Sequence, residues 1–195
     1  MTFHPRQAGF TLMELIVAVA LFGVMVTGFA AFYSMAISNQ YRKFADLNVA
    51  NGATLVRRAF DSAMGSATYI QEPSRGGATD YLTAWTNLDA DGVTPLVAGV
   101  PVQFSQLCLD GVSQRIYLYQ GNYPKPDFSC GDSTGTVIRM PLAGGQGFQN
   151  TTLTFYRPEP DLIQMTCGIT LTDTQGLNHS ASVQTQAVTS ANDQN

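Results

Sequence analysis

The opening third of the chain is apolar in a pattern that predicts one long helix. From Leu15 to Tyr41, 27 consecutive residues include no Asp, Glu, Lys, Arg or His. About 20 apolar residues in a helix cross the hydrocarbon core of a membrane, so this stretch is long enough to span one. Proline, which breaks helices, is absent between Pro5 and Pro73. The helix is therefore expected to continue past the apolar stretch.

The continuation of this helix, from Tyr41 to Thr68, is apolar on one side only. Charged residues fall mostly around the rest of its surface. The helix is therefore expected to leave the membrane near Tyr41 and to pack one side against a globular body. The apolar stripe recurs at three- and four-residue spacing and consists of Ala45, Val49, Ala53, Val56, Phe60, Ala63 and Ala67.

Beyond Pro73 the pattern changes to a period of two, which is typical of strands with one buried face. Asp110-Gly111 is a strong hairpin signal, and a second turn is expected over 173–176. These signals predict an α+β fold, in which the long N-terminal helix packs on an antiparallel β-sheet. The predicted strands span Val102–Leu109, Gln114–Gln120, Thr136–Met140, Thr151–Arg157, Ile163–Thr172 and Ser180–Val188.

Composition narrows the functions that the chain can have. Charged residues make up 12% of the sequence and the net charge is -4, so a dedicated nucleic-acid binder, which needs a basic surface, is disfavoured. No phosphate loop, GxSxG elbow or HExxH motif is present. His179 is the single histidine apart from His4. We expect no enzymatic activity and no catalytic residue.

The N-terminus holds the most informative residues. Gly9-Phe10-Thr11-Leu12-Met13-Glu14-Leu15 leads directly into the apolar stretch. A secretory signal or a plain signal anchor would not explain Glu14, because a carboxylate at the bilayer centre costs about 2.5–3.5 kcal/mol on insertion scales. The segment resembles the class III signal of type IV pilins and type II secretion pseudopilins.

This resemblance implies a set of roles at the N-terminus. In the family, a prepilin peptidase cleaves after the glycine and methylates the new terminal residue. Carried over, Gly9 is the cleavage position, Phe10 the N-methylated terminus and Glu14 the carboxylate that helps to register subunits during assembly. The expected partners are the prepilin peptidase, other pilins or pseudopilins in a filament, and the inner membrane before assembly.

Two pairings compete for the Glu14 carboxylate, one between subunits and one within the same helix. The α-amine of Phe10 in a neighbouring subunit would relieve both buried charges and set the axial register. The same two groups are four residues apart within one helix, so an internal pairing competes with the intermolecular one. Thr11 is expected to cap the start of the helix.

The resemblance also suggests how the chain is divided and what it does. We expect a leader over 1–9, a transmembrane and filament-core helix over 10–41, and a globular domain over 42–195 that includes the half-helix 42–68. The segment Asn51–Asp61 loosely resembles PilW-like minor pilins and GspJ-like minor pseudopilins, which favours a minor pilus subunit that helps to initiate or cap a filament. The alternatives are a minor pseudopilin of type II secretion and a tip subunit that binds a surface or DNA.

A tip subunit would use the loops of the globular domain for binding. Tyr123 and Phe128 could provide contacts, although aromatic residues near prolines commonly pack within their own loop. DNA would need a local basic patch, for which Lys125, Arg139 and Arg157 are the candidates. The domain would lie outside the cytoplasm, on a periplasmic or extracellular filament.

One loop resembles half of a calcium site. Asn87, Asp89 and Asp91 place side-chain oxygens at alternate positions, and Gly92 follows at the sixth, as in the first half of a calcium loop. Some pseudopilins bind calcium in surface loops, so calcium is the one candidate cofactor. The glutamate expected six residues after the glycine is absent. The alternative is a turn held by its own Asx hydrogen bonds.

The three cysteines allow three single pairings. After export the domain would face an oxidising compartment, and a bridge from Cys108 to Cys130 would close the Pro- and Gly-rich loop Gly121–Cys130. Cys167 lies on the apolar face of its strand and is expected to be a buried small hydrophobe. We predict the Cys108–Cys130 bridge, the alternative being three free thiols.

Overall fold

The computed structural model of the chain describes residues 11–133, 137–145, 147–173 and 175–189. The chain divides into two compact units, which comprise residues 1–43 and 44–195. We refer to the second of these as the globular unit.

A single helix, α1 (Leu12–Gly65), covers both the apolar stretch and its amphipathic continuation. It ends three residues before the predicted boundary. At Thr68 the backbone N–H donates to the carbonyl of Trp85, 2.8 Å away, so the chain has already joined a sheet there. The stripe predicted from spacing is the buried face of the helix, and Ala67 is buried just beyond its end.

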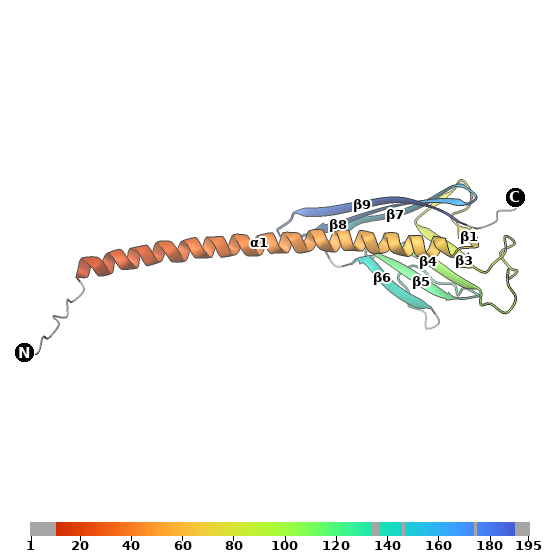
Figure 1. Cartoon of the computed structure of the whole chain (residues 1–195), viewed down its shortest axis with the longest axis horizontal. Helices are drawn as coiled ribbons and strands as arrows, with labels where there is room; N and C mark the ends of the chain where they lie inside the picture. Colours follow the sequence, from red (N-terminus) through yellow and green to blue (C-terminus); the bar gives the residue numbers. More distant parts are fainter. Residues whose placement is uncertain (1–10, 134–136, 146, 174, 190–195) are drawn as a thin grey trace, which may run out of the picture. The chain divides into compact units, whose positions relative to one another are not determined.

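Among the described residues, nine strands form two antiparallel sheets that flank the residue 44–65 part of α1 (Figure 1). Sheet A has the order β1-β3-β4-β5-β6 and sheet B the order β2-β7-β8-β9. Their bounds are β1 Tyr69–Glu72, β2 Ala78–Thr79, β3 Tyr81–Thr86, β4 Gln103–Asp110, β5 Arg115–Asn122, β6 Ile138–Gly144, β7 Phe148–Glu159, β8 Leu162–Thr172 and β9 Asn178–Val188.

The predicted strands correspond to β4 through β9, and both predicted hairpin turns connect paired strands. The predicted α+β fold, a long helix packed on antiparallel strands, is confirmed. The strands form two sheets rather than the single sheet expected, because β5 pairs with β6 while β7 pairs with β8. The sequence pattern also missed β1, β2 and β3. Residues of β3 are buried on both faces, so its sequence shows no alternation.

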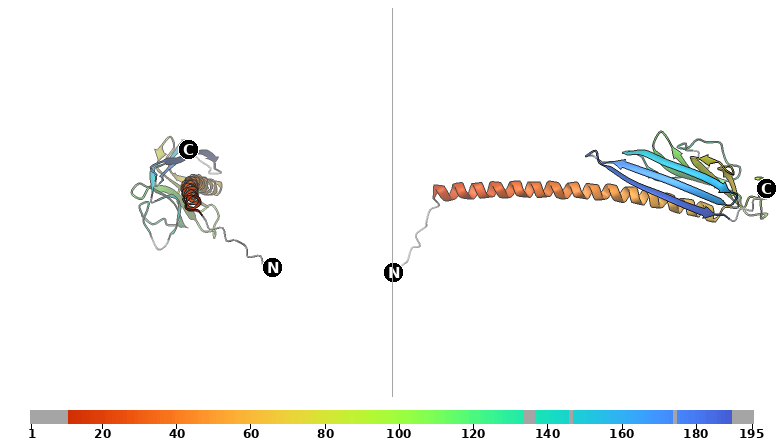
Figure 2. Two further views of the ribbon diagram at one scale, coloured as in Figure 1. Left: turned by 90° about the vertical axis from the view of Figure 1, so that its left-hand side faces the viewer. Right: turned by 90° about the horizontal axis from the view of Figure 1, so that it is seen from above.

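The main core fills the space between α1 and the inner faces of both sheets. Val56 and Phe60 of α1 are fully buried there, and the Phe60 ring stacks on Phe155 of β7 at a centroid distance of 6.1 Å. Figure 2 shows β7, β8 and β9 side by side over this part of the helix. Burial of these apolar surfaces is the main stabilising contribution to the globular unit.

Close approach of α1 to the sheets depends on a glycine. Gly52 is buried in the helix, and a Cβ at this position would lie 3.0 Å from the Cβ of Ala143 and 3.6 Å from Cδ1 of Ile169. A glycine inside a helix costs about 1 kcal/mol relative to alanine. Here the missing side chain lets the helix backbone pack directly against residues of both sheets.

A second, smaller core lies on the outer face of sheet A. It is built around Trp85, Phe104, Tyr117 and Tyr119, and Phe128 from the segment after β5 packs against it. The Phe128 ring lies 4.7 Å from Tyr119 and 6.3 Å from Phe104, between centroids. Sheet A is therefore covered on both faces, whereas the outer face of sheet B is exposed.

Candidate assembly segment and surfaces of the globular unit

The start of α1 is closed by reciprocal hydrogen bonds between Thr11 and Glu14. The backbone N–H and the hydroxyl of Thr11 donate to Oε2 of Glu14, at 2.9 and 3.0 Å. The N–H of Glu14 donates to the hydroxyl oxygen of Thr11 at 3.3 Å. This is a capping box, in which two otherwise unpaired donors of the first turn are satisfied. The capping role predicted for Thr11 is confirmed, and Glu14 takes part in it.

The pattern Thr-x-x-Glu before an apolar run is the sequence signature of a capping box. It identifies Glu14 as the residue that pairs with Thr11. Both bonds from Thr11 end on a single oxygen of Glu14. A carboxylate can accept about four hydrogen bonds, so the capping box leaves capacity for a cation. Gly9 and Phe10 lie outside the described residues.

The first half of α1 presents apolar side chains on all sides. Leu21, Phe22, Phe29 and Phe32 are among its exposed large apolar residues. Within the part of the chain that the structure describes, α1 is the one helix long and apolar enough to cross a membrane.

The predicted disulfide is present between Cys108 of β4 and Cys130, 22 residues later. It ties the segment after β5 to the outer face of sheet A. Cys167 of β8 is a buried free thiol, as predicted. Burial raises the pKa of the Cys167 thiol to about 11, so it stays protonated and unreactive at neutral pH.

The loop predicted to bind calcium is held by its own hydrogen bonds. Oδ1 of Asp91 accepts the N–H groups of Val93 and Thr94, both at 2.8 Å, and bonds to Thr94 lower the Asp91 pKa. Asn87 has a φ of 58°, and its side chain bonds the backbone of Val97 and Val100.

Asp89 accepts the N–H of Ala90 at 2.7 Å. Among the described residues, no group of three or more His, Cys, Asp or Glu side chains is placed to hold a metal. These bonds are what the Asx-turn alternative implies, and calcium binding stays a prediction.

The basic patch does not form. The Arg157 guanidinium is buried and donates to the carbonyls of Pro160 and Ile70, so it joins two strand ends and cannot contact DNA. Arg139 packs over the Tyr117 ring, 5.1 Å from its centroid. Burial of Arg157 therefore rules out a surface patch shared with Lys125 and Arg139, the one arrangement that could have favoured DNA.

The two aromatic residues of the loop, Tyr123 and Phe128, differ in how far they are buried. Phe128 packs into the outer core of sheet A, as the loop-packing alternative implies. The Tyr123 ring lies 5.8 Å from Trp85 between centroids and is 51% exposed. Tyr123 therefore keeps part of its ring available for an external contact.

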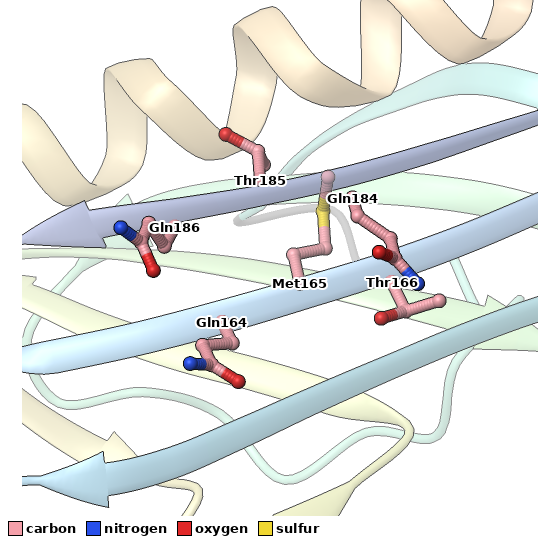
Figure 3. A pocket seen from close by; sticks show the side chains of 6 residues that line it. All are labelled: Gln164, Met165, Thr166, Gln184, Thr185 and Gln186. Atoms are coloured by element: carbon pink, nitrogen blue, oxygen red, sulfur yellow. The ribbon is translucent and has the colours of Figure 1, made fainter.

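The exposed face of sheet B is flat and uncharged over β8 and β9. Gln164 pairs with Gln186 and Thr166 with Gln184 across the two strands. Figure 3 shows these four side chains around a shallow hollow of about 330 Å³, with Thr185 extending toward α1. No group here titrates near neutral pH. The surface offers hydrogen-bonding amides and hydroxyls rather than acid–base chemistry.

Comparison with known proteins identifies the N-terminal segment. Residues 4–30 match the family model described as the prokaryotic N-terminal methylation motif. No curated protein and no solved structure matches the chain. The match covers the start of α1, whose later part packs against the two antiparallel sheets.

The matched segment is an N-terminal methylation motif, the class III prepilin signal. The motif implies processing by a prepilin peptidase and assembly into a filament. The motif and the apolar half of α1 are consistent with anchoring in the inner membrane before assembly.

Proposed function

We propose that the chain is a minor structural subunit of a type IV pilus or a related filament, which helps to initiate or cap assembly. The observation that carries the proposal is the methylation motif over residues 4–30. It places Glu14 in the first turn of α1, which has no other charged residue as far as Tyr41. The loose likeness of Asn51–Asp61 to minor subunits favours the minor role.

The proposal assigns roles along the chain. Residues 1–9 are the leader, 10–41 the membrane and filament-core helix, and 42–195 the globular domain. The peptidase cleaves after Gly9 and methylates Phe10. In the filament, the methylated amine of Phe10 from one subunit pairs with Glu14 of its neighbour, because each charge alone is costly in an apolar core.

Processing can be tested directly. The intact mass and N-terminal sequence of membrane-extracted protein should show a chain that begins with N-methylated Phe10. Gly9→Leu should accumulate as uncut precursor. Gly23→Ala is a matched control, since a Cβ at Gly23 meets nothing within 4 Å. An uncut Met1 in the wild type, or a mature start near Ile37, would contradict the proposal.

A minor pseudopilin of type II secretion is the alternative, since both systems use the same signal. Deletion of the gene separates them. Loss of sheared surface pili with normal release of exoproteins supports the pilus subunit, and the opposite result supports the pseudopilin. The number of copies per filament, from quantitative mass spectrometry of sheared filaments, distinguishes a minor from a major subunit.

A further inference from the structure

Strand β9 forms one edge of sheet B, in which the strand order is β2-β7-β8-β9. All 11 residues of β9 pair with β8, and this pairing contains no bulge. Within the described part of the chain, no backbone hydrogen bond from another segment reaches the opposite side of β9. The strand therefore presents a long, regular row of unpaired N–H and C=O groups, which is a template for a further strand.

The two edges of sheet A are protected against such pairing. β1 is 4 residues long, and its register shifts between Ile70 and Glu72. β6 contains Pro141, which has no N–H to offer, and the charged residue Arg139. Its pairing with β5 also shifts register. Short strands, bulges, proline and charge are the devices by which proteins keep a sheet edge from pairing with other chains.

The other edge of sheet B is protected as well. β2 covers β7 at Phe155 and Tyr156, and the pairing of β7 with β8 is interrupted by two register shifts. The N–H of Thr151 in β7 donates to the side chain of Gln114 at 2.9 Å. By contrast, Ser180–Val188 of β9 includes no proline and no charged residue. Among the described strands, β9 is thus the long edge that lacks every one of these devices.

The side chains of β9 indicate what kind of strand fits beside it. On the inner face, Ala181, Val183 and Ala187 pack against the main core but are only partly buried. On the outer face, the exposed residues between 180 and 186 are serines and glutamines. An added strand would cover the apolar side chains with its own inner residues and place its outer residues beside hydroxyls and amides. The edge therefore matches an extended segment in which apolar residues alternate with uncharged polar ones.

We propose that β9 is the docking edge for an extended segment of a neighbouring, different filament subunit, which adds to sheet B as a further strand. This inference rests on the proposed function, which provides such neighbours. Strand addition is a recurrent mode of recognition, in which backbone hydrogen bonds give affinity and alternating side chains give specificity.

A second copy of this chain matches the edge less well. β9 runs along the residue 44–65 part of α1 (Figure 1). Two β9 strands in antiparallel contact would therefore set this part of the two helices antiparallel. Copies of one chain insert into a membrane in one orientation, so the segment that adds to β9 comes from a different subunit.

The location of the contact is tested by photo-cross-linking of the full chain in cells. The cross-linking residue p-benzoylphenylalanine replaces Gln184 on β9 or, as a matched control, Gln164 on the same exposed face of β8. Mass spectrometry identifies the products from the membrane and sheared-filament fractions. The Gln184 variant should link to a strand of another chain that carries a methylation motif, with a yield about tenfold or more above that of the Gln164 variant.

Two adjacent proline substitutions test whether the backbone of β9 makes the contact. Successive residues of an edge strand direct their N–H groups alternately to the paired strand and outward, so only one of Ser182→Pro and Val183→Pro removes a bond within sheet B. The other should melt near the wild-type temperature but lower the cross-linking yield from Gln184 about tenfold, the effect of one lost hydrogen bond. Ser182→Ala and Val183→Ala, which keep the N–H, should cross-link near the wild-type level.

The proposal is overturned by no cross-link from Gln184, by equal yields from Gln184 and Gln164, or by a cross-link to a second copy of this chain. An unchanged yield from a proline variant that melts like the wild type also overturns it. Where both proline variants melt early, the two cross-linking sites alone decide.

The same cultures separate this proposal from the proposed function. A wild-type chain that is present in sheared filaments without a cross-link from β9 leaves the structural role standing and removes the docking edge. A wild-type chain that is absent from filaments overturns the structural role, even where the membrane fraction shows the strand contact.

Discussion

His179 of β9 bonds Asp46 of α1, which lies 133 residues earlier in the chain, with 2.7 Å between Nδ1 and Oδ1. Its other ring nitrogen lies 3.1 Å from Oδ2 of Asp173 in the β8–β9 turn. The His179 side chain is 9% exposed. This histidine therefore joins the tip of the β8–β9 hairpin to the helix, and only the protonated ring can donate to both carboxylates.

The bridge makes stability depend on pH. The hydrogen bonds to Asp46 and then to Asp173 raise the pKa of His179 above its usual 6.5. Its contribution is fully present below 6.5 and is lost as pH rises through the raised pKa. The Asp173 pKa is lowered, mainly by His179, so its own contribution is present above 3.8 and is lost as pH falls through the lowered pKa.

We therefore predict that the wild type loses thermal stability over the pH range that begins near 6.5 and runs through the raised pKa of His179. His179→Gln should be less stable than the wild type at the lower pH and should show little change across the range. Circular dichroism of the full chain in detergent measures both. Identical pH dependence of the two proteins would show that the bridge does not contribute.

Glu14→Gln is predicted to separate membrane insertion from assembly. Insertion should be retained or improved, because the amide costs less to bury than the carboxylate. Incorporation into filaments should fall by about a hundredfold or more, since breaking a buried ion pair costs about 3–5 kcal/mol. The measurement compares membrane-fraction and sheared-filament levels by immunoblot.

Thr11→Ala is the matched control for Glu14→Gln. It removes the hydroxyl of the capping box, at a cost of about 1 kcal/mol, but leaves the carboxylate for a neighbouring amine. Incorporation of Thr11→Ala should therefore stay near the wild-type level. Equal losses in the two variants would mean that Glu14 acts through the capping box alone.

The disulfide is predicted to stabilise the globular unit. A bridge that closes a 22-residue step contributes about 3 kcal/mol by the loop-entropy relation, so Cys108→Ser with Cys130→Ser should lower the free energy of unfolding by that amount. Cys167 should react with iodoacetamide only after unfolding, because its thiol is buried. Alkylation of native Cys108 or Cys130 without reductant would show that the bridge is absent.

A truncated protein that begins at Arg42 is predicted to be soluble and folded. It lacks the whole uncharged stretch but retains every buried residue of α1. A truncation that begins at Asn51 removes Ala45, Asp46 and Val49, and should unfold at a lower temperature. Gel filtration and circular dichroism test both. Aggregation of the protein that begins at Arg42 would show that the globular domain does not start there.

Alternation of apolar and polar residues predicted the strands that have one face buried and the other exposed to water. In β8, Gln164 and Thr166 are exposed while Ile163 and Met165 are buried, so the alternation is visible in the sequence. Sheet A is covered on both faces, by α1 and by the segment carrying Phe128. Four consecutive residues of β3 are buried as a result, and their sequence shows no period. One sheet was expected because alternation identifies a strand but not its partner, and β7 pairs with β8 rather than with β6.

The sequence by itself determined the methylation motif and the long helix that follows it. The motif, Glu14 and the uncharged stretch are contiguous, so they can be recognised without knowing any long-range contact. The tertiary structure alone decided which polar groups of the globular unit are paired. Arg157 is bound to the carbonyl of Ile70, 87 residues away, and Gln106 is left without a partner. Neither outcome can be read from sequence, because burial and hydrogen bonding depend on which distant segments the sheets bring together.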